Sequence, residues 1–214
     1  MDIQYLNKIF TPDDVKRLDE KQLAQLAEEI RYKLIETVSN TGGHLASNLG
    51  VVELTIAMHR AFNSPYDQFV WDVGHQVYTH KLLTGRYSQF HTLRTSGGIS
   101  GFPNPEESEH DVFAAGHSGA SISAAYGLSV ANTLDRKNSF TVAVIGDGSF
   151  TGGLVYEALN NAGRSNTNLI VVLNDNEMSI SPNVGAMAKY LAAIRTMPSY
   201  YRFKEGVEET LSNV

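Results

Sequence analysis

The stretch that decides the fold is FTVAVIGDGSFTGGLVYEALNNAGRSNTNLIVVLNDNEMSIS, residues 140–181. Phe140–Ile145 and Leu169–Leu173 are short apolar runs, which predict strands buried on both faces of a parallel sheet. Between these runs, Leu154 and Ala158 begin a repeat of i, i+4 and i+8, which predicts a helix packed through that face. A strand–helix–strand unit of this length typically forms a right-handed crossover with parallel strands. The fold class is therefore α/β, with a parallel sheet flanked by helices.

Polar residues follow both predicted strands at the point where each strand ends. Asp147 leaves the first strand, and Asn174, Asp175 and Asn176 leave the second. Parallel strands end at one edge of the sheet, and ligands of open α/β sheets bind at that carboxyl edge. One carboxylate, a side-chain amide and nearby carbonyls form an all-oxygen set that suits Mg²⁺ or Ca²⁺ rather than zinc. Because these protein anions are few, we expect a phosphorylated molecule to supply the remaining metal ligands.

Gly148 and Ser149 lie where the following helix is predicted to begin, and the N–H groups of a helix start favour anions. A helix terminus contributes only about 0.3–1 kcal/mol. That is small beside the cost of taking a diphosphate out of water, so we expect the metal to be its main counter-charge. A plain turn and a plain loop would explain GDGS and NDNE separately, but their pairing across one helix favours a site.

A nicotinamide-binding Rossmann turn is an alternative interpretation of this segment. Gly146, Gly148 and Gly152 approximate a glycine fingerprint, but their spacing is not G-x-G-x-x-G. That fold also expects an acidic residue about 20 positions further on. The polar cluster here begins nearer 28 positions on and consists mostly of amides. The interpretation as a metal–diphosphate site therefore fits the segment better.

Two histidines lie in or beside glycine-containing turns earlier in the chain. Phe69–Val73 is predicted as a strand, and Gly74 and His75 follow at its carboxyl end, which is again the functional edge. The segment TGGHLASNLG, residues 41–50, carries His44 after two glycines. On these residues alone, a structural role for His44 is favoured over a catalytic role.

A further predicted strand, Asp111–Ala115, ends in the run Gly116, His117 and Ser118. The helix predicted next, Ala120–Asn132, is rich in small side chains and can approach the sheet closely. Its start can offer Ser118 and backbone N–H groups to a phosphate. The residues alone leave a structural and a functional role for His117 equally open.

The remaining segments predict helices and one long loop. Helices are predicted at Thr11–Pro12, where Thr11 is the cap, at Glu20–Ser39, at Val51–Phe62 with Ser47 or Asn48 as cap, at Val184–Ile194 and at Tyr200–Leu211. Residues 85–111 are rich in glycine, proline and acidic residues, which predicts a surface loop, either a lid over the site or a plain excursion. His59, His80, Lys81 and His91 are expected to be structural or surface residues.

Composition narrows the class of protein. The chain has 214 residues, enough for one large domain, and its net charge of −6 argues against general nucleic-acid binding. Cysteine is absent, which excludes disulfides and thiolate metal sites and fits a cytoplasmic protein. No apolar run approaches 18 residues and the first residues lack a secretory core, so we expect no membrane partner.

The GDG turn paired with an asparagine loop resembles the metal–diphosphate motif of thiamine-diphosphate enzymes. Three further segments narrow the resemblance: WDVGHQVYTHKLLTGR (71–86), AGHSGASISAAYG (115–127) and LNDNEMSISPNVGA (173–186). Together they resemble the transketolase-like family of 1-deoxy-D-xylulose-5-phosphate synthases, from about Ile30 to the last residue. Four separated segments in the family's order make this resemblance specific.

The resemblance implies an enzyme that joins pyruvate to glyceraldehyde 3-phosphate with loss of CO2, for isoprenoid and thiamine precursor synthesis. It implies thiamine diphosphate and Mg²⁺ as cofactors and a homodimer as the assembly. Asp147, Asn176 and the Met178 carbonyl would hold Mg²⁺, and His44 and His75 would face the reacting carbon. The implied cofactor-binding residues are His75, Gly116, His117, Ser118, Gly148, Ser149 and Asn176.

The chain departs from that family in length, since the pyrimidine-binding and C-terminal domains and the cofactor-activating glutamate are missing. Residues 1–214 are therefore expected to be a truncated N-terminal domain that binds diphosphate and Mg²⁺ and is inactive alone. Two alternatives remain. One is another transketolase-like enzyme with a different donor, against which GHQ…THK beside LNDNEMSIS argues. The other is a non-catalytic module that binds Mg²⁺ and diphosphate.

Overall fold

The computed structural model describes residues 2–175 and, beyond them, residues 186, 189, 190, 193, 197 and 202. The chain divides into two compact units, Met1–Met178 and Ser179–Val214, and the fold below is that of the first unit. Asn176, Met178 and most of the two predicted helices at 184–194 and 200–211 lie outside the described residues.

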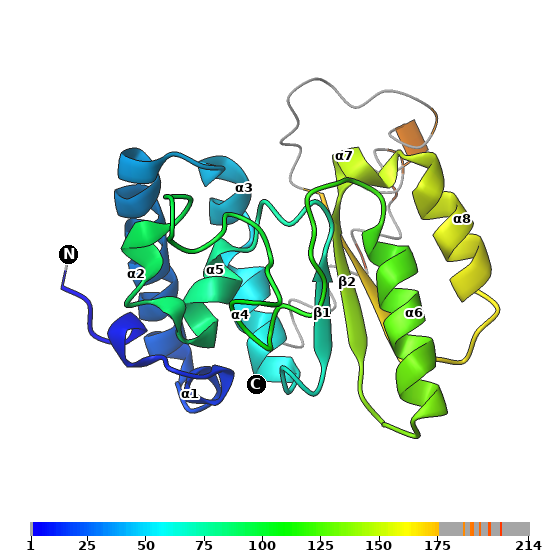
Figure 1. Ribbon diagram of the computed structural model, residues 1–214, viewed down its shortest axis with the longest axis horizontal. Helices are drawn as coiled ribbons and strands as arrows, with labels where there is room; N and C mark the ends of the chain where they lie inside the picture. Colours follow the sequence, from blue (N-terminus) through cyan, green and yellow to red (C-terminus); the bar gives the residue numbers. More distant parts are fainter. Residues whose placement is uncertain are drawn as a thin grey trace. The chain divides into compact units, whose positions relative to one another are not determined.

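The described residues form a three-stranded parallel sheet with helices on both sides (Figure 1). The strands are β1 (Gln68–Trp71), β2 (Thr141–Gly146) and β3 (Leu169–Asn174), in the order β1-β2-β3. In the register of the sheet, Trp71 lies opposite Val144, and Gly146 lies opposite Asn174. The predicted α/β fold, and the parallel pairing of the two strands that flank the GDGS turn, are confirmed.

The two predicted strands differ in burial. Thr141–Ile145 of the central strand β2 is fully buried, whereas every residue of β3 is half-buried. Among the described residues, β3 pairs with β2 alone and is therefore an edge of the sheet. The prediction of burial on both faces is correct for β2 and wrong for β3.

Four long helices cover the sheet (Figure 1). On one side lie α6 (Ser121–Leu134) and α8 (Gly153–Ala162), and on the other lie α2 (Glu20–Thr41) and α4 (Val52–Ala61). The predicted bounds of α2, α4 and α6 are correct to within two residues at each end. Within the part of the chain that the structure describes, no helix is both long and apolar enough to cross a membrane.

Short helices connect these elements. They are η1 (Leu6–Lys8), α1 (Pro12–Lys16), α3 (Leu45–Leu49), α5 (Tyr78–Lys81), η2 (Leu82–Arg86), η3 (Phe90–Thr92) and α7 (Asp147–Phe150). The start of α1 is as predicted, with Thr11 as its N-cap and Pro12 at the first helical position. The Thr11 backbone N–H donates to the Asp14 carboxylate at 2.9 Å, which closes this start of the helix.

The buried face of α8 is only partly the one predicted. Leu154 is 55% exposed, whereas Val155 and Ala158 are buried. Val155 and Ala158 stand at i and i+3, which is also a helical spacing, and it is this pair that turns toward the core. Leu154 instead lies over Gly119. A Cβ atom placed on Gly119 would be 3.4 Å from the Leu154 Cβ, which is an ordinary van der Waals contact.

Two local predictions are wrong. Asp111–Ala115 is not a strand, because the Asp111 backbone N–H donates to the Ser108 carbonyl at 3.1 Å and so closes a turn. Neither Ser47 nor Asn48 caps α4, whose N-cap is Val51 without a side-chain hydrogen bond. Both residues belong to α3, and Asn48 is fully buried there.

Residues 85–111 do not form a plain surface loop. They include η3, and their buried residues are Arg86, Phe90, Leu93, Ile99, Gly101, Pro103 and Asp111. The glycines and prolines mark turns as expected, but the apolar residues between them join the core on the α2 side of the sheet. This segment therefore packs as part of the domain.

Candidate functional site

Each of the three strands is followed by an acidic residue at the same edge of the sheet. Asp72 follows β1, Asp147 follows β2, and Asp175 comes directly after Asn174, the last residue of β3. Gly146 and Asn174 are aligned in the register, so Asp147 and Asp175 leave the sheet side by side. Asp147 is only 7% exposed. The predicted convergence of polar residues at the carboxyl edge is therefore present.

The predicted sharing of one Mg²⁺ by Asp147, Asn176 and the Met178 carbonyl stays a prediction. Asn176 and Met178 both lie outside the described residues. Among the residues that are described, no group of three or more His, Asp or Glu side chains gathers as a metal site. The predicted set differs from such a group, since it combines one carboxylate with an amide and a backbone carbonyl. Those are hard oxygen ligands of the kind that Mg²⁺ accepts.

Gly148 and Ser149 belong to α7, a single turn that begins at Asp147. The long helix that we expected to begin here starts later, at Gly153. Gly148 is exposed and Ser149 is half-buried, so both can be reached from solvent at the edge of the sheet.

His44 and His75 come from separate segments and meet edge to face. His44 directly precedes α3, and His75 lies in the turn after β1. Their ring centroids are 5.2 Å apart with an interplanar angle of 70°. The expectation that these two histidines share a site is consistent with this contact, although their chemical roles are not tested by it.

Burial lowers the pKa of both histidines. The pKa of His44 is lowered by desolvation and by the positive charge of Arg94. The pKa of His75 is lowered by desolvation and by His44, against an opposing effect of Asp72. Both shifts favour the neutral form of the ring. The Nδ1 atom of His75 is buried and has no hydrogen-bond partner among the described residues.

A buried amide ties the two histidine segments together. The Asn48 Nδ2 donates to the backbone carbonyls of His44 at 2.6 Å and His75 at 2.8 Å. The Asn48 Oδ1 accepts the backbone N–H of Tyr78 at 2.9 Å. Three hydrogen bonds from one fully buried side chain fix the separation of the two segments. We had considered Asn48 only as a helix cap, so this role was missed.

The turn before His75 is strained and tightly packed. Val73 has φ +58°, and the Gly74 N–H donates to the Asp72 carbonyl at 2.5 Å, as in a γ-turn. A β-branched residue rarely adopts positive φ, and such strain concentrates at functional sites. Gly74 has φ +82°, and a Cβ added there would lie 2.4 Å from the Pro103 Cδ. Only glycine fits this position without a shift of its neighbours.

Asp72 fixes the start of α6. Its carboxylate accepts the backbone N–H of Gly119 at 3.0 Å on each oxygen and that of Ser121 at 3.2 Å. We expected the start of this helix to offer its N–H groups to a phosphate, but two of them are occupied by Asp72. Asp72 was missed because the predicted strand, Phe69–Val73, included it. In the structure β1 ends at Trp71, so Asp72 directly follows the strand, as Asp147 follows β2.

Gly116, His117 and Ser118 precede this helix start and are exposed. Asp72 holds the next residue, Gly119, so the run stands at the carboxyl edge of β1. Its predicted contact with a diphosphate is compatible with that position and stays a prediction.

Part of the long 85–111 segment lies against the histidine pair. The Phe102 ring is 6.3 Å from the His44 ring, centroid to centroid, at 62°. Pro103 packs on Gly74, as its distance to an added Cβ shows. Of the two alternatives for this segment, lid or plain excursion, the contact excludes the plain excursion: this part of it is a wall beside His44 and His75.

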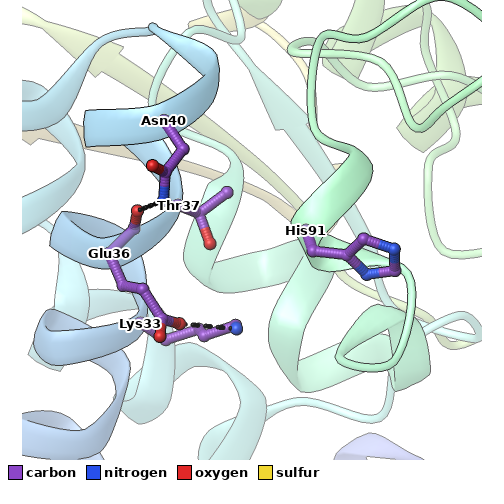
Figure 2. Close-up of a pocket in the computed structure, with 5 residues that line it drawn as sticks. All are labelled: Lys33, Glu36, Thr37, Asn40 and His91. Carbon is purple, nitrogen blue, oxygen red and sulfur yellow. Dashed lines mark hydrogen bonds and ion pairs between the residues drawn. The ribbon is translucent and has the colours of Figure 1, made fainter.

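His91 belongs to a different hollow, of about 260 Å³, between α2 and η3 (Figure 2). Its other lining residues are Lys33, Glu36, Thr37 and Asn40. Lys33 and Glu36 pair at 2.7 Å, and the imidazole of His91 extends away from the α2 side chains (Figure 2). His91 is exposed, as expected of a surface residue, and no candidate site residue lines this hollow.

Comparisons with known proteins identify the family. A family model described as 1-deoxy-D-xylulose-5-phosphate synthase matches residues 6–214. The 1-deoxy-D-xylulose-5-phosphate synthases of Alkaliphilus oremlandii and Pelotomaculum thermopropionicum are 58% and 59% identical over 99% and 98% of this chain, respectively. The matches cover 34% and 33% of those two proteins, so the chain spans about a third of their length.

A solved structure supports the fold. A transketolase variant from Pichia stipitis superposes with a TM-score of 0.64 at 20% identity, covering 78% of this chain and 30% of that one. At that identity the likeness concerns the fold alone. The sequence comparisons carry the assignment further: the chain belongs to the 1-deoxy-D-xylulose-5-phosphate synthase family.

Proposed function

We propose that this chain provides the diphosphate and metal side of a thiamine-diphosphate-dependent transferase that joins pyruvate to glyceraldehyde 3-phosphate and releases CO2. The product would be 1-deoxy-D-xylulose 5-phosphate, a precursor of isoprenoids and thiamine. The observation that carries the proposal is the convergence of the His44–His75 pair and Asp147 on one sheet edge. Membership of the family, by sequence, supports the choice of reaction.

In this proposal Asp147, the Asn176 amide and the Met178 backbone carbonyl hold Mg²⁺. The parallel pairing of β2 with β3, with Gly146 opposite Asn174, supports it, because Asn176 follows only two residues after that aligned position. A buried carboxylate beside neutral oxygen donors suits a metal whose remaining ligands are phosphate oxygens.

The diphosphate would lie between two segments of the carboxyl edge. One is the exposed run Gly116, His117 and Ser118, and the other is Gly148 and Ser149 in α7. Because Asp72 occupies the N–H groups of Gly119 and Ser121, the first segment must act through its side chains and the amides before Gly119.

The histidine pair would transfer protons at the reacting centre. Thiamine diphosphate, when bound, supplies a nucleophilic carbon for attack on the keto group of the donor. Neutral imidazoles can accept or donate a proton near neutral pH, and the unpartnered Nδ1 of His75 is suited to a polar ligand atom. The wall formed by Phe102 and Pro103 would keep water from this side of the pair.

We propose that the remaining groups of the site come from sequence outside residues 1–214, including a pyrimidine-binding part with an activating glutamate. The length of the relatives supports this division. A homodimer in the cytoplasm completes the proposal and rests on the family alone.

The test is an assay of the full gene product with pyruvate, glyceraldehyde 3-phosphate, thiamine diphosphate and Mg²⁺. We expect CO2 release and formation of 1-deoxy-D-xylulose 5-phosphate only when all four are present. Residues 1–214 alone should show no turnover. Turnover with another ketose donor and none with pyruvate would contradict the proposed reaction, and robust turnover by residues 1–214 would contradict the proposed division.

A further inference from the structure

Five charged or titratable side chains form a buried ionic cluster that the proposed function does not use. They are His80 and Lys81 of α5, Arg86 of η2, and Glu107 and Asp111 of the segment that follows. His80, Lys81, Arg86 and Asp111 are all less than 9% exposed. His80 and Lys81 are expected from the sequence to be structural or surface residues, and both are wholly buried.

The geometry of the ionic cluster is specific. The guanidinium of Arg86 binds both carboxylate oxygens of Asp111, at 2.7 and 2.8 Å, and the Lys81 Nζ lies 2.6 Å from the Glu107 Oε2. His80 contacts Asp111 at 3.2 Å. Burial raises the pKa of Asp111, but hydrogen bonds from Arg86 and His80 outweigh it and hold that pKa well below its usual range. These contacts favour the ionised form of the carboxylate.

Buried ion pairs are a weak source of net stability, because desolvation offsets much of their attraction. Replacement of buried ion pairs by apolar side chains of similar volume is often neutral or stabilising. A cluster with this many ionised groups is therefore better explained by the geometry that it imposes on its neighbours.

The ionic cluster holds both ends of one short segment, Ser100–Asn104, which we call the arch. The Ser100 backbone N–H donates to the Glu107 Oε1 at 2.6 Å. The Asn104 backbone N–H donates to the Asp111 Oδ2 at 2.9 Å. The two carboxylates that receive these bonds are the ones held by Lys81 and Arg86.

The middle of the arch touches the candidate site. Phe102 lies against the His44 ring, and Pro103 fills the space over Gly74, directly before His75. Both contacts come from residues between the two anchored ends. The arch therefore joins the ionic cluster to the histidine pair without another element between them.

We propose that the ionic cluster is a positioning device, in which Arg86 and Lys81 fix the arch and the arch fixes His44 and His75. Arg86 and Lys81 are positioning residues, because neither touches the histidines. The catalytic meaning of this inference rests on the proposed function, whereas its structural part does not. The first test therefore measures the arch itself.

That test is hydrogen–deuterium exchange of the full gene product carrying Arg86→Lys, which keeps the charge but loses the two-pronged contact. We expect exchange of residues 99–105 to rise by about tenfold or more while β2 stays protected. The matched control is Arg17→Lys, at an exposed pair with Asp14, which should change nothing. Unchanged exchange in the arch, or equal loss of protection in β2, would overturn the inference.

A second pair of variants guards against misfolding of the first. Glu107→Gln keeps an acceptor for the Ser100 N–H but removes the charge that holds Lys81. Its matched control is Glu36→Gln, at the partly exposed pair with Lys33. We expect faster exchange in the arch for Glu107→Gln alone, and an arch as protected as in the control would again overturn the inference.

Kinetics separate this inference from the proposed function. In Arg86→Lys we expect kcat to fall about tenfold with an unchanged Kd for thiamine diphosphate, because a misplaced histidine pair impairs chemistry rather than cofactor binding. A fall in affinity with unchanged kcat would contradict the positioning role. If the wild-type protein lacks the proposed activity, the proposed function fails, and the exchange results still decide whether the ionic cluster fixes the arch.

Discussion

The two sides of the candidate site are built differently. On what we call the β1 side, Asp72, Gly74 and His75 are held with His44 and Asn48 by buried hydrogen bonds and close contacts. The second set consists of the runs 116–118 and 148–149, which are exposed or half-buried. We call it the β2 side, although its first run adjoins the end of β1. The β1 side is preorganised by the protein, which is what proton transfer at fixed positions requires. The β2 side is open to solvent, which suits residues that contact a charged ligand.

Loss of a histidine should give the largest effect and would test the function of the β1 side. We expect His75→Ala to lower kcat by about a hundredfold or more, since a positioned acid or base contributes roughly 10²–10⁴. The matched control is His91→Ala, which lies in the separate hollow of Figure 2 and should retain full activity. Equal activity of the two variants would show that His75 is not part of the chemistry.

Loss of the buried amide should affect chemistry and stability together. Asn48→Ala removes three hydrogen bonds and leaves two carbonyls and one N–H without this partner. We expect the free energy of unfolding to fall by about 2–4 kcal/mol and kcat by about tenfold or more. Denaturant unfolding and steady-state kinetics measure the two effects. A loss of stability with unchanged kcat would mean that Asn48 does not position the histidines.

A contrasting result is expected on the β2 side. His117→Ala should weaken thiamine diphosphate binding by about tenfold, the loss of one charge-assisted or neutral hydrogen bond, while the free energy of unfolding stays unchanged. Titration calorimetry and denaturant unfolding provide the two readings. If His117→Ala destabilised the fold as much as Asn48→Ala does, the distinction between a held side and an open side would be wrong.

A glycine pair tests how tightly the β1 side is packed. Gly74→Ala should destabilise the protein by about 1–3 kcal/mol, because of its positive φ and the approach of Pro103. Gly127→Ala, in the middle of α6 with open space around it, should be neutral or stabilise by about 0.5–1 kcal/mol. Thermal or denaturant unfolding of the two variants gives the comparison. Similar values for both would mean that the turn is looser than the structure indicates.

The smallest effect is a dependence of stability on pH. Burial lowers the pKa of five histidines in the folded protein: His44, His59, His75, His80 and His110. Below the unfolded value of about 6.5, the unfolded chain therefore binds more protons than the folded one. The free energy of unfolding should fall as the pH drops from about 7 to 5. Urea unfolding at several pH values measures it, and constant stability over that range would contradict the burial of these rings.

The sequence predicted the sheet and its functional edge because both depend on local patterns. Apolar runs ending in GDGS and NDNE indicate strand ends directly, and parallel pairing then follows from the length of the crossover. The predicted face of α8 was correct at Ala158 and wrong at Leu154. Leu154 and Val155 are both strongly apolar, and only the packing of Leu154 over Gly119 distinguishes them. A sequence gives the residue at each position, but it does not show which residue packs against which in the folded protein.

The network around the histidines could not be predicted, because it depends on contacts between distant segments. Asn48 bonds to His75, 27 residues away, and Arg86 bonds to Asp111, 25 residues away. Asp111 was predicted to begin a strand, since its buried partner is invisible in the local sequence. Asp72 is different, because the predicted strand Phe69–Val73 included it, whereas β1 ends at Trp71 and leaves Asp72 at the edge of the sheet.

The most direct test of the central claim is a calorimetric double-mutant cycle on the metal site. Thiamine diphosphate binding would be measured with and without Mg²⁺ for the full gene product, Asp147→Asn, Asn176→Ala and the double variant. If both residues hold one ion, each single variant should lose the dependence on Mg²⁺, and the double variant should bind no more weakly than either. Additive losses, or wild-type binding that does not depend on Mg²⁺, would contradict the claim.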